Sequence, residues 1–272
     1  MNRFHPTAII HRDAKFGTDV KIGPYAVIEG AAEIGAGCVI QAHAVITGNV
    51  RMGANNTIGY GAIIGADPQD YAFDPATESL VVIGDNNRIR EHVTIHRGTG
   101  AGTETRLGNN CFLMTGVHVG HNAQIGDRVV IANNVLLAGH VHIDDGVFIG
   151  GGAVFHQFIR VGRQAIVQGN SAMSKDVPPY LIGCTINSVA GLNSIGLRRS
   201  GLSAATRLEI KIAFKLLYMS GLNTAQALAA AKERTWGPEA EAFFEFVAKA
   251  KRRGICDLVA GRSGQRGEVE LD

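Results

Sequence analysis

The stretch IGPYAVIEGAAEIGAGCVI (residues 22–40) places an isoleucine at every sixth position. The spacing continues on both sides, and an apolar residue recurs in two runs: Ile10, Phe16, Ile22, Ile28, Ile34, Ile40, Ile46, Met52, Ile58, Ile64, and then Leu107, Leu113, Val119, Ile125, Ile131, Leu137, Ile143, Ile149, Phe155, Val161, Val167, Met173. A helix repeats every ~3.6 residues and a strand every ~2, so neither gives this period. A six-residue repeat is typical of a solenoid with triangular coils, one repeat on each side.

The repeat also predicts which side chains face inward. The residue two positions before the periodic one is often small, as at Ala26, Cys38, Ala62 and Ala153. Because strand side chains alternate, both positions face the interior. Three repeats make one coil, so residue i stacks on residue i+18, about 4.8 Å away. The period leaves the handedness of the coil open, since parallel crossovers are right-handed in most proteins.

Two segments break the period, roughly 66–82 and 98–106, and we expect each to leave the prism as a loop. The first is polar and contains prolines, which makes it a candidate to cover a site. Together with the repeats, these loops belong to a predicted β-helix domain of residues 1–190.

Residues 191–272 are predicted to form a C-terminal helical domain and a tail. Ser203 is a suitable N-cap for one helix, and Thr224 starts a second, alanine-rich one. Pro238 suits the first turn of a third helix, which we expect to reach Arg253, before Gly254. Residues from about 260 onward are rich in glycine and charge and predict a loose tail.

The bulk composition excludes several classes of protein. A net charge of +2 over 272 residues gives no strong attraction to nucleic acid or to an anionic membrane. The four cysteines have neither metal-type spacing nor the density of a disulfide framework. No run of about 20 apolar residues and no signal peptide is present. We therefore expect a cytoplasmic protein without stable membrane insertion.

Histidines gather in the second half of the repeat, at His118, His121, His140, His142 and His156. Stacking by 18 places His121 in one column with Gly139 and Gln157. Three interpretations fit such a strip: solvated or interface histidines, a zinc site, or general acid–base catalysis by a neutral imidazole.

Four motifs are more specific than the repeat: IGDNNRIREHVTIHRGT (83–99), ANNVLLAGHV (132–141), VFHQF (154–158) and DVPPY (176–180). They resemble the UDP-N-acetylglucosamine O-acyltransferases that begin lipid A synthesis, and the resemblance covers nearly the whole chain. It implies a mainly β fold, a left-handed parallel β-helix with a C-terminal α-helical domain, assembled as a homotrimer with active sites between neighbouring prisms. It also implies transfer of an (R)-3-hydroxyacyl group from acyl carrier protein to the glucosamine 3-hydroxyl of UDP-N-acetylglucosamine, without metal or cofactor.

The resemblance assigns the catalytic roles. His121, in VHVGH (117–121), matches the general base, and the backbone N–H of Gly139 matches the oxyanion donor. Asp70 matches the carboxylate that holds the sugar, with Gln69 beside it. No Cys or Ser stands where a nucleophile would, which favours direct transfer without a covalent intermediate.

The resemblance also assigns binding residues. Substrate-positioning residues are matched by His96, His118, His140, His156 and Gln157. Asn193 and Arg199 match the nucleotide-binding end, where an arginine suits phosphate oxygens. Gly169 matches the position that sets acyl length, and a glycine there leaves room for a long chain.

The chain departs from the family pattern at three positions. Ala72 stands where a lysine is usual, and no lysine occurs between Lys21 and Lys175. Arg88, Arg90 and Arg97 are the candidates to supply that charge. Asn122 follows the base where an acid is common, and Ser200 replaces a second arginine. These changes bear on substrate affinity and acceptor identity more than on reaction class.

Three alternatives stay open. The acceptor could be a 3-amino UDP-sugar, which gives an amide. The chain could be a paralogue that binds nucleotide-sugar or acyl carrier protein without turnover. It could also be a zinc hydratase, since imidazoles from adjacent coils can bind zinc.

Overall fold

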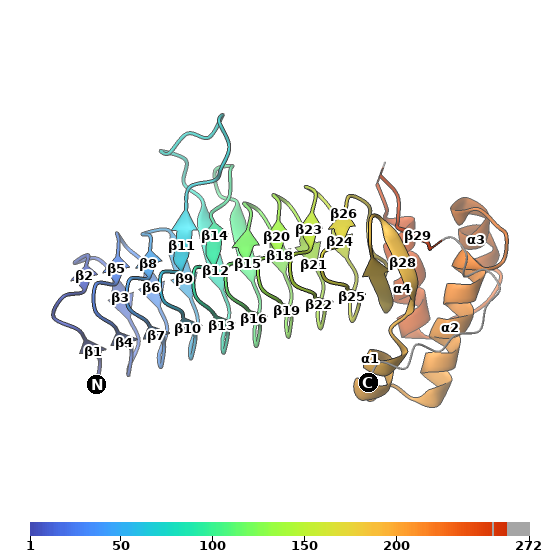
Figure 1. Cartoon of the computed structure of the whole chain (residues 1–272), viewed down its shortest axis with the longest axis horizontal. Helices are drawn as coiled ribbons and strands as arrows, with labels where there is room; N and C mark the ends of the chain where they lie inside the picture. Colours follow the sequence, from blue (N-terminus) through green and yellow to red (C-terminus); the bar gives the residue numbers. More distant parts are fainter. Residues whose placement is uncertain (252, 260–272) are drawn as a thin grey trace.

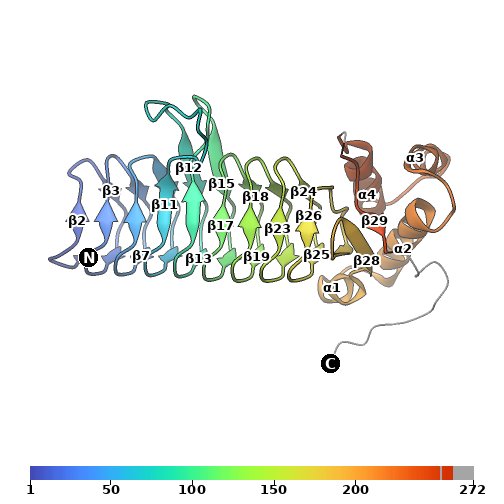
Figure 2. The same cartoon turned by 45° about the horizontal axis from the view of Figure 1, so that its top comes forward.

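The structure, a computed structural model, describes residues 1–251 and 253–259. The chain winds into a long three-sided prism of short parallel strands, and the helices pack at its C-terminal end (Figure 1, Figure 2). Val27 pairs with Val45 and Ile28 with Ile46, as the stacking of residue i on residue i+18 predicts. That prediction is confirmed for the regular coils.

Three sheets form the sides of the prism in the described residues. Sheet A contains β1 (Arg3–Phe4), β4 (Lys21–Ile22), β7 (Val39–Ile40), β10 (Thr57–Ile58), β13 (Arg88–Ile89), β16 (Phe112–Leu113), β19 (Val130–Ile131), β22 (Phe148–Ile149), β25 (Ile166–Val167), β27 (Leu181–Cys184), β28 (Ser188–Leu192) and β29 (Asp257–Leu258). Sheet B contains β2 (Ile9–Ile10), β5 (Val27–Ile28), β8 (Val45–Ile46), β11 (Ile63–Ala66), β14 (Thr94–His96), β17 (His118–Val119), β20 (Leu136–Leu137), β23 (Val154–Phe155) and β26 (Ala172–Met173). Sheet C contains β3 (Lys15–Phe16), β6 (Glu33–Ile34), β9 (Val50–Met52), β12 (Leu80–Ile83), β15 (Glu104–Leu107), β18 (Gln124–Ile125), β21 (His142–Ile143) and β24 (Arg160–Val161).

The core fills the inside of the prism with two residues from each repeat. Ile28 and Ile40 are buried, and so are the small residues Ala26 and Cys38 two positions before them. Both predicted inward positions are therefore confirmed. Burial of one isoleucine contributes about 1.5–3 kcal/mol, and each coil contacts mainly its neighbours, so stability accumulates coil by coil.

Both predicted loops are shorter than expected, because strands occupy their C-terminal ends. β12 and β15 pair in register from Leu80↔Glu104 to Ile83↔Leu107, which buries Val81 and Thr105. Ala66 likewise ends β11. The loops themselves span 67–79 and 97–103, and both leave the prism between sheets B and C (Figure 1).

The C-terminal region holds four helices among the described residues: α1 (Ser194–Arg199), α2 (Ala204–Tyr218), α3 (Thr224–Ala231) and α4 (Pro238–Ala248). The N-cap role of Ser203 and the start of α3 at Thr224 are confirmed, while α1 and the β27–β28 hairpin were not predicted. The prediction that the last helix reaches Arg253 is wrong. The chain leaves α4 at Ala248 and returns to the prism, where Cys256 N–H donates to Asp176 O (2.8 Å). The predicted tail lies outside the described residues.

Candidate active site

The edge of the prism between sheets B and C gathers both loops and most of the predicted site. Its corners are residues 120–122, 138–140 and 156–158, and we call these three corners the histidine edge. His140 N–H donates to His121 O (2.9 Å), and Phe158 N–H donates to Gly139 O (3.2 Å). The predicted column of His121, Gly139 and Gln157 is therefore present.

Hydrogen bonds determine the tautomer of His121. Asn122 Oδ1 accepts the backbone N–H of Thr99 (3.1 Å) and the Thr99 hydroxyl (2.9 Å), which identifies this atom as the amide oxygen. The same oxygen lies 2.9 Å from His121 Nδ1, so Nδ1 must donate. A neutral imidazole with a proton on Nδ1 keeps a lone pair on Nε2. His121 Nε2 can therefore accept a proton.

Gly139 lies directly against the His121 ring. A Cβ built on Gly139 would come within 3.0 Å of both Cε1 and Nε2 of His121, so any side chain there would displace the imidazole. Among the described residues, no protein atom accepts a hydrogen bond from the Gly139 N–H. A buried, unpaired N–H beside a base is the geometry that stabilises a developing oxyanion.

The neighbouring histidines His96 and His118 are packed against one another. Thr94 Oγ1 lies 2.9 Å from His118 Nδ1, and the His96 and His118 rings lie 5.0 Å apart. Burial, with smaller contributions from His96 and His121, lowers the pKa of His118 to about 4. His96 is buried and donates through Nδ1 to the carbonyl oxygen of Asp67 (2.6 Å).

His140 and His156 complete the edge. The His140 ring stacks on Phe158 with centroids 4.5 Å apart and meets the His121 ring edge-on at 5.1 Å. Burial, and then the neighbouring charges of His121 and Lys251, lower the pKa of His140. His156 is exposed and lies beside Gln157, whose carbonyl oxygen is 3.1 Å from His156 Nδ1.

The structure does not bring Asp70 and Gln69 to the histidines of the same chain. Both are exposed on the loop of residues 67–79, which projects outward (Figure 1). Asp70 Oδ1 accepts the Ala72 N–H (3.0 Å) and so caps a turn. Between these two loop residues and the histidine edge, the described part of the chain shows no hydrogen bond or ion pair.

Asn193, Arg199 and Gly169 lie elsewhere on the prism. Asn193 is buried, caps α1 through Gly196 N (2.9 Å) and donates to Gln164 O (2.9 Å). Arg199 is exposed in the last turn of α1. Gly169 is exposed between sheets A and B, where an added Cβ would lie 3.0 Å from Gly151 O. Sheet B therefore separates Gly169 from the histidine edge.

Two general features bear on the alternatives. In the described part of the chain, no three His, Cys, Asp or Glu side chains are grouped so that they could hold one metal ion. No helix among residues 1–251 and 253–259 has the length and apolar character needed to cross a bilayer.

Known proteins similar to this chain were found by sequence and by structure. Residues 176–256 match the family model described as UDP-N-acetylglucosamine O-acyltransferase, domain 2, and residues 13–48 and 104–139 match the bacterial transferase hexapeptide model. The acyl-[acyl-carrier-protein]–UDP-N-acetylglucosamine O-acyltransferase of Janthinobacterium sp. (strain Marseille) is 43% identical over 264 residues, which cover 94% of this chain and 99% of that protein. The chain belongs to this acyltransferase family.

Solved structures of the family agree with this assignment. The UDP-N-acetylglucosamine acyltransferase of Francisella novicida superimposes with a TM-score of 0.90 at 39% identity, covering 95% of both chains. That of Bacteroides fragilis superimposes with a TM-score of 0.86 at 42% identity, covering 92% of this chain and 98% of the other. The predicted left-handed β-helix of hexapeptide repeats and the prediction of an acyltransferase are both confirmed.

The departures from the family pattern take on a physical meaning in the structure. Asn122 provides a neutral oxygen to His121 where a carboxylate is common. None of the arginines considered as replacements for the lysine at Ala72 is available at the histidine edge. Arg97 is buried and paired with Asp67 (2.8 Å), Arg90 pairs with Glu91 (3.0 Å), and the Arg88 guanidinium lies over the Phe112 ring at 5.0 Å.

Sequence reasoning missed four residues of this region. Thr99 and Thr105 position Asn122, because Thr105 Oγ1 accepts the Asn122 N–H (2.7 Å). Lys251 and Arg253 reach the edge from the segment after α4. The stacking of residue i on residue i+18 does not predict the contacts of the two threonines with Asn122, because the loop of residues 97–103 shifts the register. Lys251 and Arg253 lie outside the six-residue repeat, so the repeat does not predict where they pack.

Proposed function

We propose that the chain transfers an (R)-3-hydroxyacyl group from acyl carrier protein to the glucosamine 3-hydroxyl of UDP-N-acetylglucosamine, in lipid A biosynthesis. One observation carries the proposal: His121 Nε2 keeps its lone pair, and the His121 ring lies directly against Gly139, whose backbone N–H has no acceptor among the described residues. A base and an oxyanion donor in contact are the two groups that acyl transfer to a hydroxyl needs. The relatives described above are named for acyl transfer to UDP-N-acetylglucosamine, in the Janthinobacterium protein from acyl carrier protein.

The proposed mechanism needs no covalent enzyme intermediate. His121 Nε2 takes the proton of the 3-hydroxyl while the hydroxyl oxygen bonds to the thioester carbonyl carbon. The negative charge that forms on the carbonyl oxygen accepts the Gly139 N–H. The carbon–sulfur bond then breaks, and the sulfur takes the proton from the imidazolium. The products are the 3-O-acyl sugar and the free thiol of the carrier protein.

The remaining predicted residues are proposed to hold the substrates. Burial lowers the pKa values of His118 and His140, so both stay neutral at neutral pH. His140 offers a donor and an acceptor to sugar hydroxyls, whereas His118 Nδ1 bonds to Thr94 Oγ1 (2.9 Å) and leaves only Nε2 for the sugar. His96, His156 and Gln157 flank them. Asp70 and Gln69 would bind the sugar from a neighbouring subunit, Asn193 and Arg199 the nucleotide, and Gly169 would leave the acyl groove open.

We infer that the active unit is a homotrimer, with each site between two prisms. The outward face of sheet B is apolar, with Ile63, Leu136 and Val154 exposed in the single chain. Sheet C instead carries ion pairs on its outward face, such as Lys15–Glu33 (3.0 Å). Exposed apolar faces mark protein interfaces. Light scattering on the purified protein is expected to give about three times the chain mass of 28.8 kDa, and a monomer would contradict the inference.

The test of the function is a product assay with UDP-N-acetylglucosamine and (R)-3-hydroxyacyl carrier proteins of several chain lengths. We expect acylated sugar from the wild type and a loss of about 10²–10⁴-fold in rate for His121→Ala. His43→Ala is the matched control, since His43 lies between sheets A and B, away from the histidine edge, and stacks on Tyr25. Full activity of His121→Ala would refute the mechanism.

Two further arms of the assay separate the alternatives. Competition between the hydroxyl sugar and its 3-amino analogue, read by mass spectrometry, distinguishes ester from amide formation. Binding of UDP-N-acetylglucosamine without acylation by any donor would identify a non-catalytic paralogue. Stoichiometric zinc in the purified protein would reopen the hydratase interpretation.

A further inference from the structure

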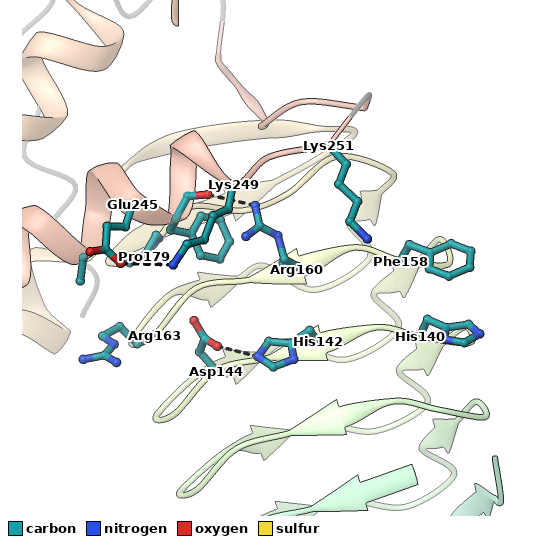
Figure 3. A pocket seen from close by; sticks show the side chains of 12 residues that line it. His140, His142, Asp144, Phe158, Arg160, Arg163, Pro179, Glu245, Lys249 and Lys251 are labelled. Carbon is teal, nitrogen blue, oxygen red and sulfur yellow. Dashed lines mark hydrogen bonds and ion pairs between the residues drawn. The ribbon is translucent and has the colours of Figure 1, made fainter. Parts of the chain in front are cut away.

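A basic cleft runs from the histidine edge across sheet C to α4 (Figure 3). It measures about 450 Å³, and His140 and Phe158 line one end. Arg163 and Pro179 line it as well, with α4 on the outer side. The cleft therefore begins at His140, whose ring lies 5.1 Å from that of the proposed base His121, and ends at the outer surface of the same chain.

Some charges in the cleft are neutralised and others are not. Arg160 is bound by Asp176, with Nε and Nη2 at 2.9 and 2.6 Å from Oδ2, and it also donates to Phe246 O (3.0 Å). Lys249 pairs with Glu245 (3.2 Å), as Figure 3 shows. Within the described residues, Lys251 and Arg163 form no ion pair with a carboxylate. Asp144 also lines the cleft and bonds to His142 Nε2 (2.9 Å), so two unpaired cations face this one carboxylate and the excess charge of the cleft is positive.

The segment after α4 brings two cations to the histidine edge. Arg253 Nη2 donates to His156 Nε2 at 3.2 Å. Lys251 points into the cleft beside Phe158 (Figure 3), close enough to His140 to contribute to lowering its pKa. The corners of the histidine edge themselves, residues 120–122, 138–140 and 156–158, contain neither lysine nor arginine.

The segment is held in place on both sides. α4 precedes it, and Arg160 ties that helix to the prism through Phe246 O and the Phe246 ring (4.2 Å). After it, Asp176 N–H donates to Gly254 O (3.1 Å) and Asp176 O accepts the Cys256 N–H (2.8 Å). Lys251 and Arg253 are thus presented at the edge by anchored backbone, which reduces the entropic cost of binding a ligand.

We propose that Lys251 and Arg253 form a phosphate-binding subsite at the histidine end of this cleft. A lysine ammonium and an arginine guanidinium are the two cations suited to phosphate oxygens, the second through paired N–H donors. The inference rests on the proposed function, in which both substrates carry phosphate: a diester on the prosthetic arm of the carrier protein and a pyrophosphate in the UDP-sugar. Either phosphate would be held within one or two coils of His121.

The experiment measures binding and turnover separately on the full-length protein. Lys251→Ala, Arg253→Ala and the double variant are compared with Lys232→Ala, an exposed lysine at the end of α3. Binding is titrated with UDP-N-acetylglucosamine, with carrier protein bearing its phosphopantetheine arm, and with carrier protein lacking the arm. Turnover gives kcat and KM for each substrate.

We expect each single variant to raise the KM and Kd of one phosphate-bearing substrate about tenfold, the loss of one charge-assisted hydrogen bond. We expect kcat of the alanine variants to change less than twofold. Lys232→Ala should behave as wild type, and Lys251→Arg should bind with near wild-type affinity because it keeps the positive charge. Weaker binding only of the arm-bearing carrier identifies the diester, and weaker binding only of the UDP-sugar identifies the pyrophosphate.

Two outcomes overturn the proposal. Unchanged affinities in the double variant would show that no phosphate is bound there. Equal weakening for carrier with and without its arm would assign the cations to the carrier's protein surface instead. Both outcomes leave wild-type transfer intact, whereas an inactive wild type would reject the proposed function itself.

Discussion

The histidine edge and the edge between sheets C and A are built from the same repeat but differ in the hydrogen bonding of their backbone amides. We call the second edge the Asx edge, because an aspartate or asparagine occupies the same corner position in successive coils. These side chains form a ladder of hydrogen bonds and are Asp85, Asn109, Asp127 and Asp145. Ala54 N–H donates to Asp85 Oδ1 (2.7 Å), and Asp85 N–H donates to Asn109 Oδ1 (2.7 Å). The ladder continues through the next two coils at 2.7 and 2.9 Å.

At the histidine edge the corresponding amides, those of His121, Gly139 and Gln157, have no such side chain above them. Within the described residues, none of these three N–H groups donates to a protein acceptor. The Asx edge therefore uses these amides to join coils, whereas at the histidine edge they stay unpaired within the described residues. The difference follows from the side chain at one corner position. At the Asx edge it is aspartate or asparagine, and at the histidine edge it is His121, Gly139 or Gln157.

A glycine-to-alanine substitution should have the largest effects of the variants considered, on kcat at the histidine edge and on stability at the Asx edge. In Gly139→Ala the new Cβ lies within 3.0 Å of the His121 ring, so the imidazole must move away from residue 139. We expect kcat to fall about 10²–10³-fold, with little change in Tm.

In Gly126→Ala the Cβ lies within 3.0 Å of Asp145 Oδ1 in the ladder. We expect lower stability but wild-type specific activity. The reverse assignment of effects would break the comparison.

A side-chain deletion in the ladder should cost stability alone. Asp127→Ala removes the acceptor of Asn109 N–H (2.7 Å) and of Asn109 Nδ2 (3.0 Å). The loss is expected to be about 1–2 kcal/mol and to lower Tm by about 2–4 °C per kcal/mol. Differential scanning calorimetry and the product assay on one preparation measure both quantities. A loss of kcat in this variant would show that the Asx edge also serves catalysis.

The fold was predictable because each coil repeats the same local pattern. The i+18 rule places His121, Gly139 and Gln157 in one column from sequence alone. It fails where the repeat is interrupted: Thr99 meets Asn122 across 23 positions, not 18. It is silent on Arg253, which lies 97 positions from His156 and arrives only through the packing of α4. Arg97 was a poor candidate for the missing charge because the loop of residues 67–79 buries it.

Introducing charge at the histidine edge should shift its pH dependence. In Asn122→Asp a carboxylate replaces the neutral oxygen 2.9 Å from His121 Nδ1. A nearby negative charge stabilises the protonated, imidazolium form of His121. Because the base must be neutral, the acidic limb of the kcat/KM profile should move to higher pH, with the plateau largely retained. An unmoved limb would show that His121 ionisation does not control the rate.

Burial of His118 should make the protein less stable in mild acid. Its pKa in the folded chain is about 4, below the ordinary value of 6.5. Between these values the unfolded chain binds a proton that the folded chain does not, so stability falls as pH decreases from about 6.5 to about 4. We expect His118→Gln to lose part of this dependence in denaturant titrations at several pH values. An unchanged pH dependence would contradict the burial of a neutral imidazole.

The central claim, that the histidine edge leaves Nε2 of His121 ready to accept a proton, is tested most directly by ¹⁵N NMR of the histidine side chains. The resonances that disappear in His121→Gln are those of His121, and the spectrum is recorded at a pH high enough for the imidazole to be neutral. The account predicts a proton on Nδ1 and none on Nε2, and loss of this preference in Asn122→Ala. A proton on Nε2 in the wild type would contradict it.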